Sequence, residues 1–163
     1  LAYYLMSREK DVPLPKPRIP AGYRVRSLTA KQVQLVFPLE EKYQHEEVLI
    51  HPERFNRRAH MMHFRQVVSK QHVLFIETSE GPVAKAGTNS IGSGYCQIGG
   101  VYTLPAYRRQ HLSRALMIHL LRWCRHAGYS AALFVRKENT AAVELYRGLS
   151  FDVETGYRII YMV

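Results

Sequence analysis

A long amphipathic helix between two strands is the central prediction from this sequence. Four large apolar side chains recur at helical spacing and share one stripe: Leu112, Leu116, Leu120 and Trp123. We therefore expect a helix from about His111 to His126. The run Tyr95–Thr103 predicts a strand before it, and a bulge or a splay of the backbone is expected at Gly99-Gly100. The apolar run Ala131–Val135 follows the helix and is typical of a strand buried on both faces of a sheet.

The remaining segments extend this alternation toward both ends of the chain. In the N-terminal half, a strand is predicted at 23–28, followed by a helical segment at 29–49 that is interrupted near Pro38. A second helical segment is predicted at 52–70, and a hairpin is predicted from two strands at 72–78 and 83–88. After the central unit, Asn139 is expected to cap a short helix, and two strands are expected within 151–163. The order β-α-α-β-β-β-α-β-α-β-β predicts an α/β domain with a mixed sheet.

The first 21 residues are predicted to lie outside this domain. An apolar tail, Leu1–Met6, leads into the segment Val12–Pro20, which holds four of the eight prolines. Closely spaced prolines disfavour helix and sheet and favour an extended linker. Because the chain begins with Leu, we expect an upstream region before residues 1–21 and a folded domain over residues 22–163.

Length and composition fit a single globular domain. The chain has 163 residues, of which 47% are hydrophobic and 22% charged, which argues against intrinsic disorder. No apolar run reaches the roughly 18 residues of a membrane span, so no membrane association is expected. The two cysteines, Cys96 and Cys124, are too few for a disulfide framework or a zinc ribbon, and they fit a reducing cytoplasm.

The formal net charge of +10 is unevenly distributed along the sequence. No acidic residue occurs between Gly81 and Lys137, a stretch with eight cations: Lys85, Arg108, Arg109, Arg114, Arg122, Arg125, Arg136 and Lys137. Such a region attracts phosphate, whether of a nucleic acid, a phosphorylated cofactor or an anionic membrane surface. A solvated basic face that keeps the protein soluble is the plain alternative.

The junction between the central strand and the long helix is the strongest candidate site. A short basic loop, Tyr107–Gln110, connects the two elements. The unpaired N–H groups of the first helical turn and the positive end of the helix dipole form an anion site there. One anion–dipole contact is worth only about 0.3–1 kcal/mol, so firm binding needs the flanking arginines as well.

Two motifs, one at the start of the long helix and one around the short helix that follows, resemble those of the GNAT superfamily of acyl-CoA-dependent N-acetyltransferases. Family members show a proline and then Arg-x-x-Gly-x-Gly/Ala at the start of the long helix, aligned here with Pro105, Arg108, His111 and Ser113. Downstream they show a second pattern, aligned here with Asn139, Ala142, Leu145-Tyr146 and Ser150-Phe151. The resemblance covers residues 73–151 well, and the element order extends it to 22–163. It implies a mixed, splayed central sheet flanked by helices.

The resemblance also implies roles for individual residues, with acetyl-CoA as co-substrate and no metal. The strand edge Val101, Tyr102 and Thr103 would pair with the pantetheine arm, which Asn139 would also contact. The pyrophosphate would lie on the loop and helix start: Arg108, Arg109, Gln110, His111, Leu112, Ser113 and Arg114. Tyr146 matches the tyrosine that protonates the departing thiolate, since a phenol with a pKa near ~10 is still protonated at neutral pH.

Two departures from the family pattern concern the cofactor loop and the general base. His111 and Ser113 stand where the family has glycines, and His111 would either obstruct the phosphate or add a ligand to it. Many members carry a glutamate on the preceding strand, where this chain has Gln97. The sequence does not decide which group is the general base. The acceptor pocket is expected at 43–62, and the candidates are ordered water and five side chains, of which the first four lie in that range: His45, Glu46, Glu47, His51 and Glu77.

The sequence thus predicts an N-acetyltransferase that acts on a primary amine by direct attack in a ternary complex. The acceptor, a small molecule or a protein, is not identified. A non-catalytic GNAT-like module that binds acyl-CoA or a partner is the alternative, and a homodimer stays open. Nucleic-acid binding is disfavoured because no aromatic-basic motif is present. No metal site is predicted, because the histidines near Glu46 and Glu47 lack the spacing of a zinc-binding helix.

Overall fold

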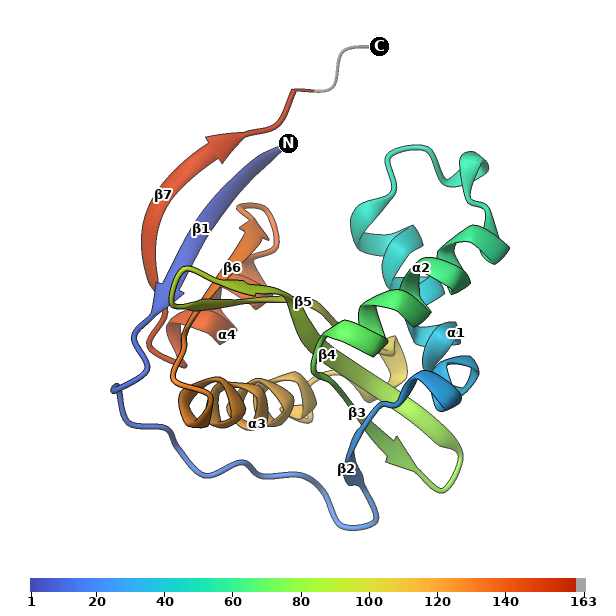
Figure 1. Cartoon of the computed structure of the whole chain (residues 1–163), viewed down its shortest axis with the longest axis horizontal. Coiled ribbons are helices and arrows are strands. Elements are labelled where there is room, and N and C mark those ends of the chain that lie inside the picture. The colour runs from blue at the N-terminus through green and yellow to red at the C-terminus, as the bar shows by residue number, and fades with distance from the viewer. Residues whose placement is uncertain (161–163) are drawn as a thin grey trace.

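The structure, a computed structural model, describes residues 1–160, which form an open mixed sheet flanked by helices (Figure 1). The strands are β1 (Ala2–Arg8), β2 (Arg24–Ser27), β3 (Val73–Thr78), β4 (Gly81–Gly92), β5 (Tyr95–Thr103), β6 (Ser130–Arg136) and β7 (Asp152–Arg158). The α-helices are α1 (Val33–Tyr43), α2 (Arg57–Lys70), α3 (Leu112–His126) and α4 (Thr140–Arg147). Short 3₁₀ turns lie at Ala30–Gln32, Pro52–Arg54 and Pro105–Tyr107, and a π-helical turn follows α1 at Gln44–Val48.

The strand order is β2-β3-β4-β5-β6-β1-β7, and neighbours are antiparallel except for the parallel pair β5–β6. One core lies between the sheet and helices α3 and α4, and includes Ile76, Ile98 and Leu116. A second core lies between α1, α2 and the opposite face of the sheet, and includes Phe37 and Phe75. This layered mixed architecture confirms the predicted fold class.

The N-terminal segment is part of the sheet, so the prediction of a tail outside the domain is wrong. Strand β1 lies between β6 and β7, with Tyr3 opposite both Arg136 and Tyr157. Met6 is fully buried in the core. The side chain of Arg8, also buried, donates hydrogen bonds of 3.0 and 2.8 Å to the carbonyl oxygens of Val12 and Pro13. The proline-rich stretch after β1 has no helix or strand, as expected.

Three other segments differ from the sequence prediction. Helix α1 continues through Pro38, where an interruption was expected. Proline has no N–H group, so the carbonyl oxygen of Gln34 loses its partner within the helix, but both residues are exposed and water can replace that partner. The helix expected over 52–70 is split, and Asn56 caps α2 by accepting a hydrogen bond of 3.0 Å from the Ala59 amide. At the C-terminal end β7 is one continuous strand without a turn at Thr155-Gly156. The part of the second strand expected at 161–163 lies outside the described residues.

Strands β5 and β6 diverge along their length, which opens the sheet beside α3. They pair only where Tyr95–Ile98 lies opposite Ser130–Leu133. Beyond that point β5 continues against β4 alone, and a bulge shifts the register between Lys85 and Gly87. Gly100, at the bulge, has a φ of +62°, a left-handed conformation that glycine adopts without strain. The bulge predicted at Gly99-Gly100 is therefore present.

Candidate active site

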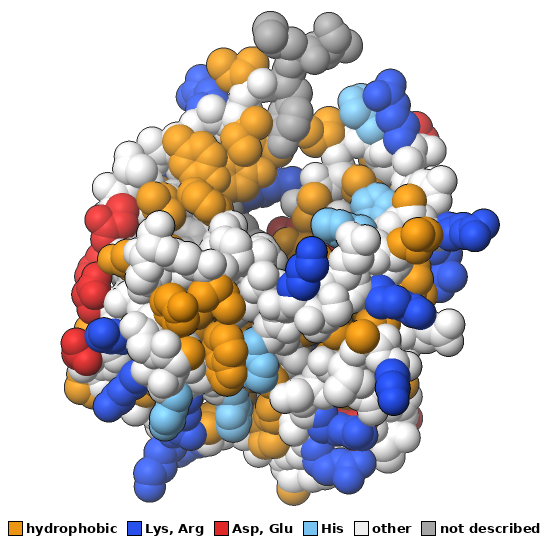
Figure 2. Space-filling model, in the orientation of Figure 1, with side chains coloured by type: hydrophobic (Ala, Val, Ile, Leu, Met, Phe, Trp, Pro, Cys, Tyr) orange, Lys and Arg blue, Asp and Glu red, His pale blue; other side chains and the backbone are white. Residues whose placement is uncertain are grey.

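A cavity of about 1340 Å³ lies where β5 and β6 diverge. Its walls come from the end of β5, the loop and first turn of α3, the end of β6 and helix α4. The cavity is also lined by residues of β1, of the proline-rich segment after β1, of the end of α1 and of the turn that follows α1. The space-filling view is hollowed between the β1–β7 side and the α1–α2 side of the molecule (Figure 2).

The structure brings the sequence-predicted site residues together around this cavity, with one exception. Those that line it are Val101, Tyr102, Thr103, Arg108, Arg109, His111, Leu112, Ser113, Arg114, Asn139 and Tyr146. Gln110 belongs to the same loop but does not line the cavity. Residues separated by more than forty positions in the sequence, such as Val101 and Tyr146, thus meet because α3 and β6 return the chain to the diverging edge of β5.

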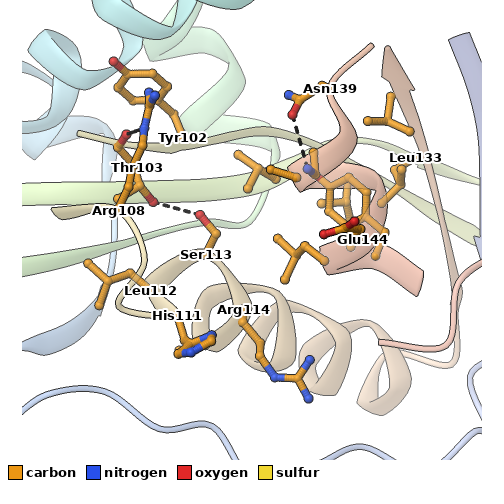
Figure 3. A pocket seen from close by; sticks show the side chains of 18 of the residues that line it. Tyr102, Thr103, Arg108, His111, Leu112, Ser113, Arg114, Leu133, Asn139 and Glu144 are labelled. Carbon is orange, nitrogen blue, oxygen red and sulfur yellow. Dashed lines mark hydrogen bonds between the residues drawn. The ribbon is translucent and has the colours of Figure 1, made fainter. Parts of the chain in front are cut away.

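In the loop before α3, two residues adopt the left-handed backbone conformation although neither is glycine. Arg109 has a φ of +62°, and His111, which precedes the first residue of α3, has a φ of +59°. This conformation costs a residue with a side chain roughly 1–2 kcal/mol, which explains why glycine suits such positions. The exposed imidazole of His111 lies on the opposite side of the helix start from the Ser113 hydroxyl (Figure 3). The imidazole therefore borders the cavity without lying on the Ser113 side of the helix start.

Ser113 connects the start of α3 to the end of β5. Its hydroxyl group lies 2.8 Å from the hydroxyl of Thr103, as the dashed line in Figure 3 shows. The first hydrogen bond within α3 runs from the Ala115 amide to the His111 carbonyl oxygen, so the amides of residues 112–114 have no partner inside the helix. A ligand in the cavity can use these N–H groups.

Arg108 turns toward the segment after α1 and not along α3. Its Nη2 atom donates a hydrogen bond of 2.8 Å to Glu46 Oε1, and its guanidinium lies 5.6 Å from the centre of the Tyr102 ring. The Tyr102 hydroxyl donates a hydrogen bond of 2.8 Å to the second oxygen, Glu46 Oε2. Burial by itself would raise the pKa of Glu46, but these hydrogen bonds outweigh it and lower the pKa. With both oxygens occupied, Glu46 is a poor proton acceptor.

Helix α4 contributes Asn139 and Tyr146 to the opposite wall. Asn139 caps the helix, because its Oδ1 accepts a hydrogen bond of 3.2 Å from the Ala142 amide (Figure 3). Tyr146 is 7% exposed. Burial raises the pKa of the Tyr146 phenol, and nearby Tyr43 and Glu47 raise it further. The phenol therefore stays protonated at neutral pH and can donate a proton inside the cavity.

Of the five side chains considered as a base, only Glu47 lines the cavity. Glu77 forms ion pairs of 3.1 and 3.0 Å with Arg24 and Arg26. His45 packs on Phe55, and His51 pairs with Glu53. Within residues 1–160, Glu47 has no ion pair of its own. Sequence alone could not select Glu47, because the π-helical turn that aims it at the cavity has no distinct sequence pattern.

A buried ion pair beside Tyr43, which lines the cavity, was not predicted. Lys85 Nζ lies 2.8 Å from Glu40 Oε2, and 4.4 Å from the centre of the Tyr43 ring. Burial lowers the pKa of Lys85, and the neighbouring Glu40 carboxylate acts in the opposite direction. A lysine in the otherwise apolar run 83–87 was the one available signal, because a buried lysine requires a partner.

Among residues 1–160, no three His, Cys, Asp or Glu side chains are arranged to hold a metal ion. Within the same range, no helix has both the length and the apolar character needed to cross a bilayer.

Comparisons with known proteins agree with this architecture. The model of the acetyltransferase (GNAT) family matches residues 35–151. A putative GNAT-family acetyltransferase from Novosphingobium aromaticivorans has a TM-score of 0.69 and 18% identity, covering 95% of this chain and 60% of that chain. A GCN5-related N-acetyltransferase from Sphaerobacter thermophilus has a TM-score of 0.71 and 20% identity, covering 96% of this chain and 49% of that one.

A third structure is that of the aminoglycoside N-acetyltransferase AAC(6')-Iy in complex with CoA. It has a TM-score of 0.67 and 15% identity, covering 90% of this chain and 98% of that chain. The chain spans about half the length of the first matching structures, 48% and 60% of two of them. No curated protein matches it. Because the family model spans more than half of the sequence, the chain belongs to the GNAT acetyltransferase family.

Proposed function

We propose that this chain transfers the acetyl group of acetyl-CoA to a primary amine by direct attack in a ternary complex. One observation carries the proposal: a single cavity joins unpaired helix amides and free cations at one end to a buried phenol and an unpaired carboxylate at the other. The first end suits a diphosphate, and the second suits proton transfer. The reducing cytoplasm is the compartment we expect, because it would keep Cys96 and Cys124 as thiols.

The residues present fit acetyl-CoA. The amides of residues 112–114, together with Arg109 and Arg114, would hold the diphosphate. Past Ile98, β5 has no strand partner on the side that faces the cavity, so main-chain groups of Val101–Thr103 on that side could hydrogen-bond the pantetheine arm. The Thr103 carbonyl oxygen is an exception, because it accepts a hydrogen bond of 3.0 Å from Arg108 Nε. Asn139 faces the same space from α4. Bound acetyl-CoA would supply an acyl group activated as a thioester.

Tyr146 would donate the proton that the leaving sulfur needs. A thiol has an ordinary pKa near ~8.5, so it leaves as a thiolate at neutral pH. The buried Tyr146 phenol remains protonated under the same conditions, because burial raises its pKa. A positioned acid of this kind contributes roughly 10²–10⁴-fold to the rate.

Glu47 would accept the proton of the acceptor amine. A lysine-like amine with a pKa near ~10.4 costs about 4.6 kcal/mol to deprotonate at pH 7, whereas an α-amine near ~8 costs about 1 kcal/mol. Glu47 lines the cavity on the side of the segment after α1, near Tyr43 and Tyr146. Neither Glu46 nor Glu77 is free for this purpose, since arginines hold both.

Calorimetry with acetyl-CoA, followed by a thiol-release assay over a panel of amines, tests the proposal. The panel should include aminoglycosides, small diamines, amino acids and peptides. Binding with turnover on at least one amine is the expected result. Binding without turnover on any amine would favour a non-catalytic acyl-CoA module, an alternative that the left-handed His111 and the missing strand glutamate at Gln97 keep open. Absence of acetyl-CoA binding would contradict both.

A further inference from the structure

The proline-rich segment 12–20, which we call the strap, is fixed to the body of the domain. Arg8 binds the carbonyl oxygens of Val12 and Pro13 at the start of the strap. Leu14 and Ile19 pack against the core that contains α3. The strap crosses the molecule along α3 on its way from β1 to β2 (Figure 1). Its prolines restrict the backbone, so its charged side chains project from a stiff support.

The strap runs from the end of α3 toward its start. Leu14 lies beside Arg122 and Arg125, in the last turns of the helix. Farther along the strap, Pro15, Lys16 and Arg18 line the large cavity together with the loop that precedes α3. The strap therefore forms a wall of the cavity, at the end where the helix amides are free.

Lys16 and Arg18 add two cations to this wall. Both side chains are exposed, and within residues 1–160 neither has an ion pair. Arg108 differs from them, because Glu46 already neutralises it. The two acidic residues that line the cavity, Glu47 and Glu144, come from the segment after α1 and from α4. The strap end of the cavity thus holds more positive charge than one diphosphate requires.

We propose that Lys16 and Arg18 bind the 3′-phosphate of coenzyme A. This inference rests on the proposed function. Coenzyme A carries two separate anionic groups, the diphosphate and the ribose 3′-phosphate, and the second group needs its own cations. A guanidinium and an ammonium on a stiff backbone suit a phosphate, because little side-chain and backbone freedom is lost on binding. The strap then selects the full cofactor over a thioester that lacks the 3′-phosphate.

Calorimetry with acetyl-CoA and with the same thioester of 3′-dephospho-CoA tests the inference. We expect the unaltered protein to bind acetyl-CoA about 10–100-fold more tightly, the range for hydrogen bonds to a charged group. In the double variant Lys16→Ala/Arg18→Ala this preference should fall to about 1–3-fold. The charge-matched control Arg122→Ala/Arg125→Ala removes two cations at the other end of α3 and should keep the full preference. Melting temperatures of both variants report any loss of folding.

The possible results separate this inference from the proposed function. Equal binding of the two thioesters by the unaltered protein overturns the role of the strap and leaves the acetyltransferase proposal standing. The same holds if the control variant loses the preference and the strap variant keeps it. If neither thioester binds the unaltered protein, the proposed function itself fails.

Discussion

The Nζ atom of Lys85 donates a hydrogen bond of 2.7 Å to the carbonyl oxygen of Gly100. This contact joins β4 to the bulge of β5, directly before the residues that we expect to hold the pantetheine arm. A Cβ atom at Gly100 would lie only 3.0 Å from Nζ, so the bulge and the lysine fit each other closely. Glu40 on α1 neutralises the ammonium and thereby connects the bulge to the helix beside the acceptor side of the cavity.

Replacing Lys85 by methionine should destabilise the protein by about 3–5 kcal/mol, because Glu40 is left buried without its cation. Urea denaturation measures this loss. The double variant Lys85→Met/Glu40→Gln removes the stranded charge as well, and should recover a large part of the stability. Single and double variants of equal stability would mean that the ion pair is not the cause.

The sequence predicted the central unit β5-α3-β6 because its signals are local. The apolar stripe of α3 and the glycines of the β5 bulge can be found within single segments of the chain. Strand β1 was missed because its partners, such as Arg136 and Tyr157, lie far away in the sequence and the neighbouring prolines resemble a linker. Pairing between distant strands is decided by tertiary packing, which a short sequence window does not contain.

Some residues of the candidate site could likewise be predicted from the sequence, and others could not. Ser113 and Asn139 could be assigned through the resemblance of their motifs to those of the GNAT family, and the structure places both at the cavity. The ion pair of Glu40 with Lys85 requires α1 to dock on β4, which no local pattern predicts. The choice of Glu47 among the candidate bases likewise depends on which carboxylates arginines already occupy, and only the assembled fold reveals that.

The variant His111→Gly should be at least as stable as the unaltered protein. Glycine relieves a left-handed conformation worth roughly 1–2 kcal/mol and costs about 0.4–1 kcal/mol through the unfolded chain, so a net gain of about 0–1.6 kcal/mol is expected. Acetyl-CoA affinity should be maintained or improved, because the imidazole lies on the opposite side of the helix start from the Ser113 hydroxyl (Figure 3). A marked loss of affinity would instead make His111 a phosphate ligand.

Ser150→Gly is the control for this prediction. Ser150 has a φ of +64° and lies outside the cavity lining. It should report the relief of strain alone, with a similar gain in stability and no change in acetyl-CoA affinity. Urea denaturation and calorimetry on both variants measure the two quantities separately.

Tyr146→Phe should lower kcat by roughly 10²–10⁴-fold and leave the Kd for acetyl-CoA nearly unchanged. The phenylalanine ring keeps the packing on Phe151, whose ring centre lies 5.9 Å away, so the fold should be preserved. Tyr107→Phe is a matched control, because Tyr107 lines the cavity but its hydroxyl is bound to Glu80 at 3.1 Å. Steady-state kinetics that show equal kcat values for the two variants would remove Tyr146 as the acid.

Glu47→Gln should reduce kcat/KM for the amine by about 10²-fold or more, since the amide cannot accept a proton. Glu41→Gln alters a carboxylate on the neighbouring helix α1 that does not line the cavity and pairs with Arg57. That control should keep its activity. A Glu47→Gln variant with full activity would point to ordered water as the base.

The hydrogen bond from Tyr102 to Glu46 should make stability depend on alkaline pH. Burial and this hydrogen bond raise the pKa of Tyr102 to about 12, whereas the unfolded chain has a tyrosine pKa near ~10. Between these two values the folded protein keeps a proton that the unfolded chain has lost. The free energy of unfolding therefore falls as the pH rises through this window.

The variant Tyr102→Phe removes this contribution while Tyr43, whose pKa burial also raises to about 12, keeps its own. Urea denaturation of both proteins at pH 9 and at pH 11 isolates the effect of Tyr102. The unaltered protein should have a higher free energy of unfolding than the variant, and this difference should be larger at pH 9 than at pH 11. At pH 11 the unfolded chain has already lost the Tyr102 proton that the folded protein keeps, which reduces the contribution of the phenol to stability. An identical stability difference at the two pH values would show that the phenol is not held in its protonated form by Glu46.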